Sequence, residues 1–352
     1  RLEHLLKATL DAGHQAILLL NRRGYSNFVY CPSCSHVMQC KYCDVTLTYH
    51  RSAGVKAHGG SFAEGIHTGQ LHCHYCLAVN PLPDKCPDCG KKLSLFGLGT
   101  QRVEEEIQHK FPDLKYARVD SDTMRSLKDY ESLLGRFAKG ELQVMLGTQM
   151  IAKGLDYPNV TLVGVISGDT ALALPDFRAA ERTFQLITQV AGRAGRGDVP
   201  GRVVLQTFLP DDPTIQAAIK QDYLSFARRE LLTRREVGLP PMSRMVRIIL
   251  RDSDLDRLHA RSEKLAAILA SVIATAPSTS SSSPSVPSSA PVTLKGPMPC
   301  AINRISGYHR VQLLLFSPSA TSLQRVLTLA RQQKAFADSD RIAVDVDPIS
   351  LL

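Results

Sequence analysis

The sequence predicts an α/β protein in which a doubly wound lobe is interrupted by a cysteine-rich module and followed by a ferredoxin-like α+β domain. Short apolar strands alternate with helical stretches through residues 1–238, which is typical of a mainly parallel sheet. Four Cys-x-x-Cys pairs interrupt this alternation within residues 31–92. Beyond Pro240-Pro241 the order is strand, helix, strand, strand, helix, strand, as in the ferredoxin-like arrangement.

The doubly wound lobe begins with a helix over residues 2–12. An apolar strand over 16–20 follows and ends at Asn21-Arg22-Arg23-Gly24. Ligands bind at the carboxyl edges of such strands in open α/β sheets. The alternation resumes after the cysteines with helices expected at 103–111 and 130–140, and strands at 115–120 and 142–146. Two more strands, at 160–167 and 202–208, complete the expected parallel sheet.

A long charged helix is expected over 214–237, where Gly238 and Pro240-Pro241 stop it. The second domain follows, with strands at 245–251, 292–296, 308–316 and 341–347, and helices at 255–275 and 321–335. Residues 277–291 are almost entirely Ser and Pro, so we expect a disordered surface loop. A domain boundary here is the alternative, but it would divide a six-element unit into two unstable halves.

Charge and hydropathy limit the function classes. No apolar run approaches the roughly 20 residues needed to span a bilayer, so we expect a soluble cytoplasmic protein. The chain carries 42 Lys and Arg against 33 Asp and Glu, a formal net charge of +9. The basic excess is concentrated between Arg178 and Arg251, which favours a polyanionic partner. A merely solvated basic surface is the alternative.

Eight of the nine cysteines form four closely spaced pairs, and Cys300, the ninth, is expected to be a buried small residue. Two residues between thiols let both ligate one metal, so four pairs predict two closed Cys₄ zinc sites. A redox pair is the alternative for any single Cys-x-x-Cys, and four clustered pairs argue against it. Six nearby histidines are then spectators, and Gly-rich residues 52–70 are expected to be a flexible loop. The pairs are Cys31/Cys34, Cys40/Cys43, Cys73/Cys76 and Cys86/Cys89.

Two stretches resemble motifs V and VI of superfamily 2 nucleic-acid translocases: 147–158 and Gln189-Val-Ala-Gly-Arg193-Ala-Gly-Arg196. In the first, a strand ends at Gly147-Thr148, where free backbone N–H groups and a hydroxyl could hold a phosphate of a DNA backbone. In the second, Arg193 and Arg196 lie three apart, so on a helix they would share one face and reach one polyanion. A solvated basic helix end is the alternative.

The other half of such a motor is missing from the sequence. A GxxxxGK[ST] phosphate loop and an acidic Mg²⁺-binding motif do not occur. We interpret the chain as the C-terminal half of a larger protein and expect it to be inactive alone.

The whole pattern resembles the primosomal protein N′ (PriA) family of bacterial replication-restart helicases. The resemblance rests on residues 21–25, the four cysteine pairs, and residues 97–106, 147–158, 175–179, 189–196 and 345–352. It implies a RecA-like helicase lobe 2 over 1–238 with a zinc module inserted at 31–92, then a C-terminal domain over 239–352. It also implies an ATP-dependent 3′-to-5′ DNA helicase that recognises stalled forks and restarts replication through primosome assembly.

The resemblance also implies residue roles. Arg193 and Arg196 would face ATP, with Gln189 coupling motif VI to the nucleotide. Gly154 and Asp156 would lie on the ATP side of motif V. Contacts to DNA would come from Thr148, Lys153, Arg22 and Arg102. One zinc ion would be bound by the outer pairs, Cys31, Cys34, Cys86 and Cys89, and the other by the inner pairs, Cys40, Cys43, Cys73 and Cys76.

The implied cofactors are two Zn²⁺ per chain and, in the full protein, ATP with Mg²⁺. The implied partners are forked and single-stranded DNA, primosome proteins, single-stranded DNA-binding protein and the replicative helicase. The chain departs from the family at Leu155 and Tyr157, where His and Phe are usual, and at Gln101, where Glu is usual. A non-catalytic DNA- or protein-binding module and an RNA helicase relative are the competing functions.

Overall fold

The computed structural model describes residues 1–20, 28–50, 69–73, 75–96, 100–119, 124, 126–148, 151, 157–169, 171–172, 174, 176–195, 199–275, 290–337 and 340–351. The side chains of 28, 50, 95–96 and 100–102 are not described. The chain forms two compact units: residues 1–29, 94–174 and 178–226, and residues 30–93, 175–177 and 227–352. Among the described helices, none combines the length and the apolar composition required to cross a bilayer.

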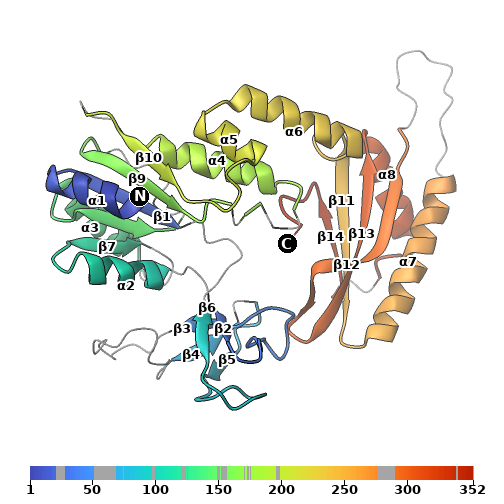
Figure 1. Ribbon diagram of the computed structural model, residues 1–352. Coiled ribbons are helices and arrows are strands. Elements are labelled where there is room, and N and C mark those ends of the chain that lie inside the picture. Colours follow the sequence, from blue (N-terminus) through green and yellow to red (C-terminus); the bar gives the residue numbers. More distant parts are fainter. Residues whose placement is uncertain are drawn as a thin grey trace. The chain divides into compact units, whose positions relative to one another are not determined.

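The first unit contains the predicted parallel sheet. Its five strands pair in parallel in the order β10-β9-β1-β8-β7 (Figure 1). Every residue of β1, β8 and β9 is buried, as expected for central strands covered on both faces. The strands are β1 (Gln15–Leu20), β7 (Tyr116–Val119), β8 (Val144–Gly147), β9 (Val160–Ile166) and β10 (Arg202–Leu205).

Helices cover both faces of this sheet, so the lobe is doubly wound. Alternate residues of β1 point to opposite faces. Ile17 and Leu19 belong to a core that includes Phe137 of α3 (Leu127–Ala138) and Val190 of α4 (Ala179–Ala191). On the other face, Leu18 packs in a core with residues of α1 (Leu2–Asp11) and α2 (Thr100–Lys110).

The cysteine-rich module contains a second sheet of very short strands, in the order β5-β4-β3-β2-β6. We did not expect these strands, because segments of three residues are too short to show a periodic apolar pattern. They are β2 (Phe28–Tyr30), β3 (Thr48–His50), β4 (Gln70–His72), β5 (Val79–Pro81) and β6 (Ser94–Phe96).

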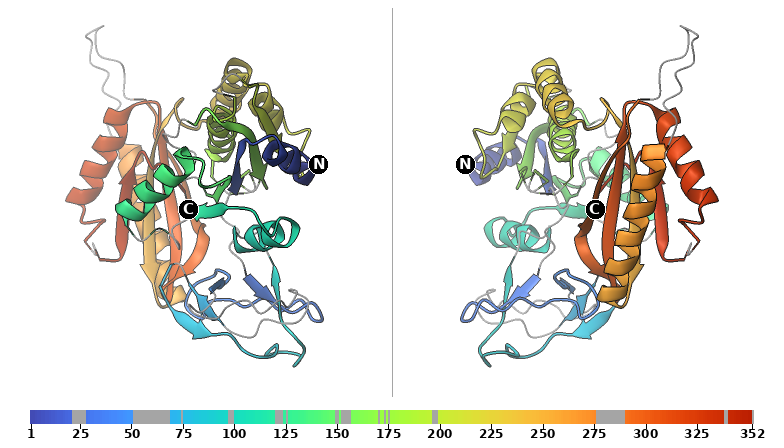
Figure 2. Two further views of the ribbon diagram at one scale, coloured as in Figure 1. Left: turned by 90° about the vertical axis from the view of Figure 1, so that its left-hand side faces the viewer. Right: turned by 90° about the vertical axis from the view of Figure 1, so that its right-hand side faces the viewer.

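The C-terminal sheet is antiparallel, in the order β12-β13-β11-β14. Its strands are β11 (Arg244–Asp252), β12 (Thr293–Ile305), β13 (Tyr308–Ser317) and β14 (Ile342–Val346). Helices α7 (Leu255–Thr275) and α8 (Ala320–Gln332) pack on one face through a shared apolar core (Figure 2). The six elements follow one another in the predicted order, and residues 277–289 of the Ser/Pro segment lie outside the described residues.

The single helix expected over 214–237 is wrong. The structure has two helices, α5 (Pro213–Ile219) and α6 (Tyr223–Val237). Gln221 adopts a positive φ of 54° between them, which no helix continues through. The Asp222 carboxylate then accepts a hydrogen bond from the Ser225 N–H at 3.0 Å and caps the new helix.

Candidate metal centres and motor-motif segments

The eight paired cysteines lie in two groups of four, and in each group the sulfur atoms all lie within 4.8 Å of one another. The outer pairs form one group, Cys31, Cys34, Cys86 and Cys89, and the inner pairs form the other, Cys40, Cys43, Cys73 and Cys76. From spacing alone the pairing stayed open. The grouping is the one that the family resemblance implies.

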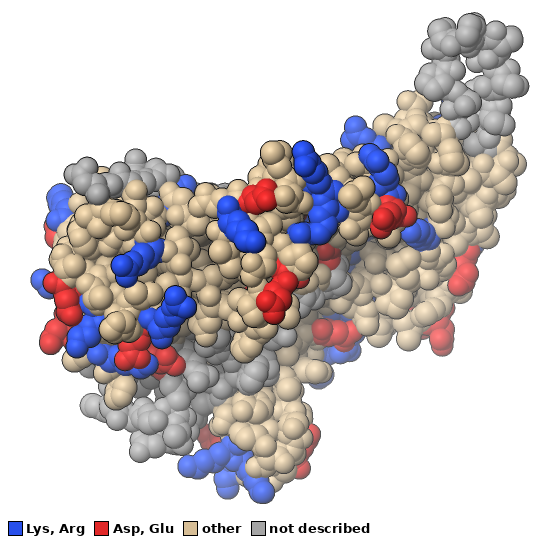
Figure 3. Space-filling view, turned by 45° about the horizontal axis from the view of Figure 1, so that its top comes forward, with Lys and Arg blue, Asp and Glu red and all other residues tan. Residues whose placement is uncertain are grey.

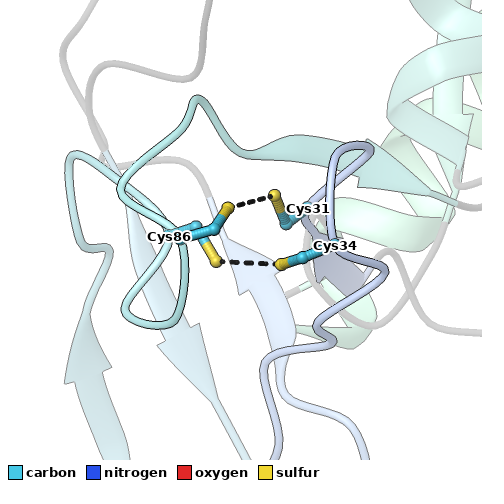
Figure 4. Close-up of side chains that lie close together, drawn as sticks. Cys31, Cys34 and Cys86 are labelled. Carbon is cyan, nitrogen blue, oxygen red and sulfur yellow. Dashed lines mark hydrogen bonds between the residues drawn. The ribbon is translucent and has the colours of Figure 1, made fainter.

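The outer cluster joins the two ends of the module (Figure 4). The Sγ atoms of Cys31 and Cys89 lie 3.4 Å apart, and those of Cys34 and Cys86 lie 3.6 Å apart. Its second cysteines, Cys34 and Cys89, are exposed, while the first ones are buried. Nearby His36 does not join the thiols; its Nδ1 lies 2.6 Å from the Asp88 carboxylate.

The inner cluster is more enclosed. Cys40, Cys43 and Cys73 are all buried, and the Sγ atoms of Cys40 and Cys76 lie 3.6 Å apart. Burial is the largest influence that raises the pKa of Cys43 to about 12, so this thiol stays protonated unless a cation replaces the proton. Four sulfur donors within 4.8 Å of one another suit tetrahedral Zn²⁺. Both groups therefore fit closed structural sites, and Cys300 belongs to neither.

Thr148 lies immediately after β8, as expected, at the carboxyl edge of the parallel sheet. A Cβ atom on Gly147 would lie 2.3 Å from the Val119 carbonyl oxygen of the neighbouring strand, so only glycine fits there. That carbonyl accepts the Thr148 N–H at 3.3 Å. Our expectation of a free N–H at Thr148 is therefore wrong, since the adjacent strand already uses it, and the side-chain hydroxyl is the group left to contact a phosphate.

Gln189 is exposed in the last turn of α4, and Arg193 lies beyond the helix. The premise that Arg193 continues a helical face is wrong, because α4 ends at Ala191 and Gly192 is its C-terminal cap. Gly195 then takes a positive φ of 72°, and its N–H donates to the Val160 carbonyl at 3.1 Å. Residues 192–195 thus form a turn that is hydrogen-bonded to the first residue of β9.

Thr148 and Gly195 lie at opposite edges of one sheet. Thr148 follows the last residue of β8, whereas Gly195 is bonded to the first residue of β9, a parallel strand of seven residues. Such a strand is about 20 Å long. β8 therefore ends at one edge of the sheet, and β9, the next strand along the chain, begins at the other.

Two of the other stretches that carry the resemblance meet within the second unit. The Ser350 hydroxyl donates to the Asp176 carboxylate at 2.9 Å, and the Leu351 N–H donates to it at 3.3 Å. The Arg234 guanidinium lies over the Phe177 ring, 5.3 Å from its centroid, and donates to the Phe177 carbonyl. The C-terminal residues are therefore held by the segment just before α4.

Several predicted site residues lie outside the described residues: Arg22, Lys153, Gly154, Asp156 and Arg196. Arg102 lies in α2, and its side chain is not described. On the face drawn in Figure 3, basic side chains are interspersed with acidic ones, so this face does not form one uninterrupted basic surface.

Comparison with known proteins gives two family matches in chain order. Residues 83–198 match the helicase conserved C-terminal domain, and residues 235–349 match the primosomal protein N C-terminal domain. The first match includes both motif segments and the last cysteine pair. The second includes the C-terminal sheet and both of its helices.

Relatives named replication restart protein PriA align with nearly the whole chain. The Bacillus subtilis protein is 38% identical over 97% of this chain and 39% of its own length. For the Haemophilus influenzae protein the identity is 37%, over 98% of this chain and 44% of the relative. The chain thus spans about two-fifths of these relatives and corresponds to their C-terminal part. The Pyrococcus furiosus Hef helicase domain is 16% identical over 63% of this chain and 27% of its own, with a TM-score of 0.27.

Proposed function

Because the chain belongs to the PriA replication-restart family, we propose that it is the C-terminal part of an ATP-dependent 3′-to-5′ DNA helicase. In this proposal the complete protein recognises stalled replication forks and restarts replication through primosome assembly. The match of nearly the whole chain to proteins of that name carries the proposal. The chain itself contains no Walker A loop, so it contributes the second motor lobe and does not hydrolyse ATP alone.

Within the lobe we assign ATP and DNA to the two opposite sheet edges. We assign Arg193, in the turn after α4, and Arg196 to the nucleotide phosphates, and Gln189, in the last helical turn, to sensing the nucleotide. A planar guanidinium suits this role because it stabilises charge that develops during phosphoryl transfer. Thr148, at the other edge, contacts the DNA backbone, and we assign Lys153, Arg22 and Arg102 to DNA by the family resemblance. Motif V, with Gly154 and Asp156, connects the two.

The two cysteine clusters bind one Zn²⁺ each in this proposal. The metal would replace four thiol protons per site and fix the module's short strands, which bury too little apolar surface to be stable alone. ATP would bind with Mg²⁺ between this lobe and the remainder of the protein.

We further propose a helicase lobe over 1–238, a zinc module over 31–92 and a ferredoxin-like domain over 239–352. The strand order β12-β13-β11-β14 and its antiparallel pairing support the last assignment. The partners would be forked DNA, single-stranded DNA-binding protein, primosome proteins and the replicative helicase, in the cytoplasm.

The test is a pair of substitutions in the full-length protein. Arg196→Ala should reduce ATP turnover on fork DNA by about 10³-fold and leave fork affinity within a few-fold of normal. Thr148→Ala should weaken the stimulation of ATPase activity by DNA and leave basal hydrolysis largely intact. ATPase rates with and without fork DNA, measured beside fork affinity, separate the two roles. If Arg196→Ala lost DNA affinity but kept basal hydrolysis, the assignment of this arginine to ATP would be wrong.

A further inference from the structure

The four Cys-x-x-Cys turns are alike in one respect and differ in another. We call each pair with the two residues after it a knuckle: 31–36, 40–45, 73–78 and 86–91. In every knuckle the N–H of the first cysteine donates to the carbonyl five residues later, at 2.7–2.9 Å. All four turns therefore begin in the same way.

Three knuckles close on themselves. The residue after the second cysteine donates its N–H back to the first cysteine's carbonyl at 2.8–2.9 Å, and it has a positive φ of 61–69°. The next residue along the chain donates its N–H to the sulfur of the second cysteine. The closing residues of these knuckles are Ser35, Leu77 and Gly90.

The fourth knuckle, 40–45, closes on the C-terminal domain instead. Asp44, the residue after the second cysteine, does not have a positive φ. Its N–H donates to the Arg304 carbonyl at 3.0 Å. The sulfur of Cys43 accepts its backbone hydrogen bond from Ser306, at 3.1 Å. Both contacts come from the end of the β12–β13 hairpin, so this hairpin replaces two hydrogen bonds that the other knuckles make internally.

Two more contacts hold the hairpin in place. The N–H of Gly307 donates to the Tyr42 carbonyl at 2.7 Å, and the Arg304 guanidinium donates to the Asp44 carboxylate at 3.1 Å. Ser306 and Gly307 have φ values of 52° and 82°, the geometry of a type I′ turn, and Ile305 pairs with Tyr308. The turn is therefore a defined structure that presents its N–H groups to the knuckle.

We propose that the β12–β13 hairpin is part of the inner metal site, so that metal binding there and seating of this hairpin on the cysteine module are one coupled equilibrium. Hydrogen bonds to ligand sulfur orient the ligand and stabilise its metal-bound form, and losing such a partner typically costs 10–100-fold in affinity. The outer cluster has no such dependence, because both of its knuckles close internally. This inference rests on the proposal that each cluster holds zinc.

The first test uses zinc release from the whole chain into excess chelator. In one variant, residues 304–309 are replaced by Asn-Gly, which shortens the hairpin by two residues per strand and keeps a type I′ turn. We expect one of the two zinc ions to leave about 10–100-fold faster and the other at the wild-type rate. Asp88→Ala is the control, since it removes the carboxylate of the His36–Asp88 pair beside the outer cluster and should leave the inner zinc unaffected.

A second variant tests whether the knuckle at 40–45 can be made to close internally. Adding Asp44→Gly to the shortened hairpin lets residue 44 adopt the positive φ that Gly90 has, so that the turn can close internally. Zinc release from the inner cluster should then be about as slow as in the wild type. Equal acceleration of both zinc ions in the shortened variant, acceleration of neither, or no recovery with Asp44→Gly would overturn the proposal.

A second measurement needs no variant. Hydrogen exchange of wild-type protein, zinc-loaded and after chelation, should show that residues 300–310 lose protection with the metal while β11 keeps its own. Unchanged protection at the hairpin would contradict the coupling. The zinc content of the wild type separates the two proposals: fewer than two ions per chain overturns the two-site assignment, whereas two ions released independently of the hairpin overturns only the coupling.

Discussion

Gly195 and Gly192 flank Arg193, and the structure predicts opposite outcomes when each becomes alanine. At Gly195, with φ +72°, a Cβ atom would lie 2.3 Å from the Gly201 nitrogen and 2.9 Å from its Cα. At Gly192 the φ is −68° and the nearest atoms to a new Cβ would be 3.6 and 3.7 Å away. The first contacts are impossible without backbone movement, and the second are ordinary van der Waals distances.

The magnitudes follow from these contacts. A non-glycine residue in the left-handed region costs about 1–2 kcal/mol, and forcing atoms into a filled space costs about 1–3 kcal/mol. Gly195→Ala should therefore destabilise the lobe by about 3 kcal/mol, which lowers Tm by roughly 6–12 °C for a domain of this size. Gly192→Ala fits its site and should stabilise by about 0.4–1 kcal/mol, because it restricts the unfolded chain.

Differential scanning calorimetry of the two variants beside wild type makes the comparison directly. In the full-length protein, Gly195→Ala should also impair fork-dependent ATP turnover, since it displaces the turn that carries Arg193. The reasoning would be refuted if Gly195→Ala melted at or above the wild-type temperature, or if Gly192→Ala were the more damaging change.

Three further predictions concern metal, acid and catalysis. Elemental analysis should find two zinc ions per chain, and one ion per chain would contradict the two-site assignment. Both ions should be lost as the pH falls, because protons compete with zinc for thiols such as Cys43, whose pKa is raised to about 12 by burial. Asp252→Asn should lower Tm by about 4 °C or more at pH 7, because Arg261 and Arg341 lose a buried carboxylate at 3.2 and 2.7 Å. The Asp254 N–H and the neighbouring arginines lower the pKa of Asp252, although burial acts in the opposite direction. The stability that the Asp252 carboxylate contributes is therefore present above the ordinary pKa of 3.8 and is lost as the pH falls through the lower pKa of the folded protein. A Tm difference between wild type and variant that persisted at pH 2 would count against this cause. The chain alone should show no ATP turnover with or without DNA, and measurable turnover would show that it holds a complete phosphate site of its own.

Much of the fold could be predicted because long elements repeat their signals. Leu258, Leu265, Leu269 and Val272 recur on one face of α7, and all four are buried in the C-terminal core. The apolar run of β9 likewise becomes a fully buried central strand. Such patterns depend on local periodicity, which the sequence displays directly.

Other features depend on contacts that no local pattern reports. Gln221 has no intrinsic preference for a positive φ, so the break between α5 and α6 was missed, although Asp222 was an available capping signal. The end of α4 could have been placed at Gly192, because a glycine directly after the last periodic residue is a helix stop signal. By contrast, nothing in the sequence around Ser306 indicates a contact with Cys43, which lies 263 positions earlier.

The cysteine module enters and leaves its sheet at neighbouring strands, β2 and β6. Just inside these strands, the outer cluster ties Cys31 and Cys34 to Cys86 and Cys89. The outer cluster therefore holds together the two ends of the inserted module. A change in chain length inside the insertion need not displace the end of β1 or the start of α2, between which it lies in the sequence.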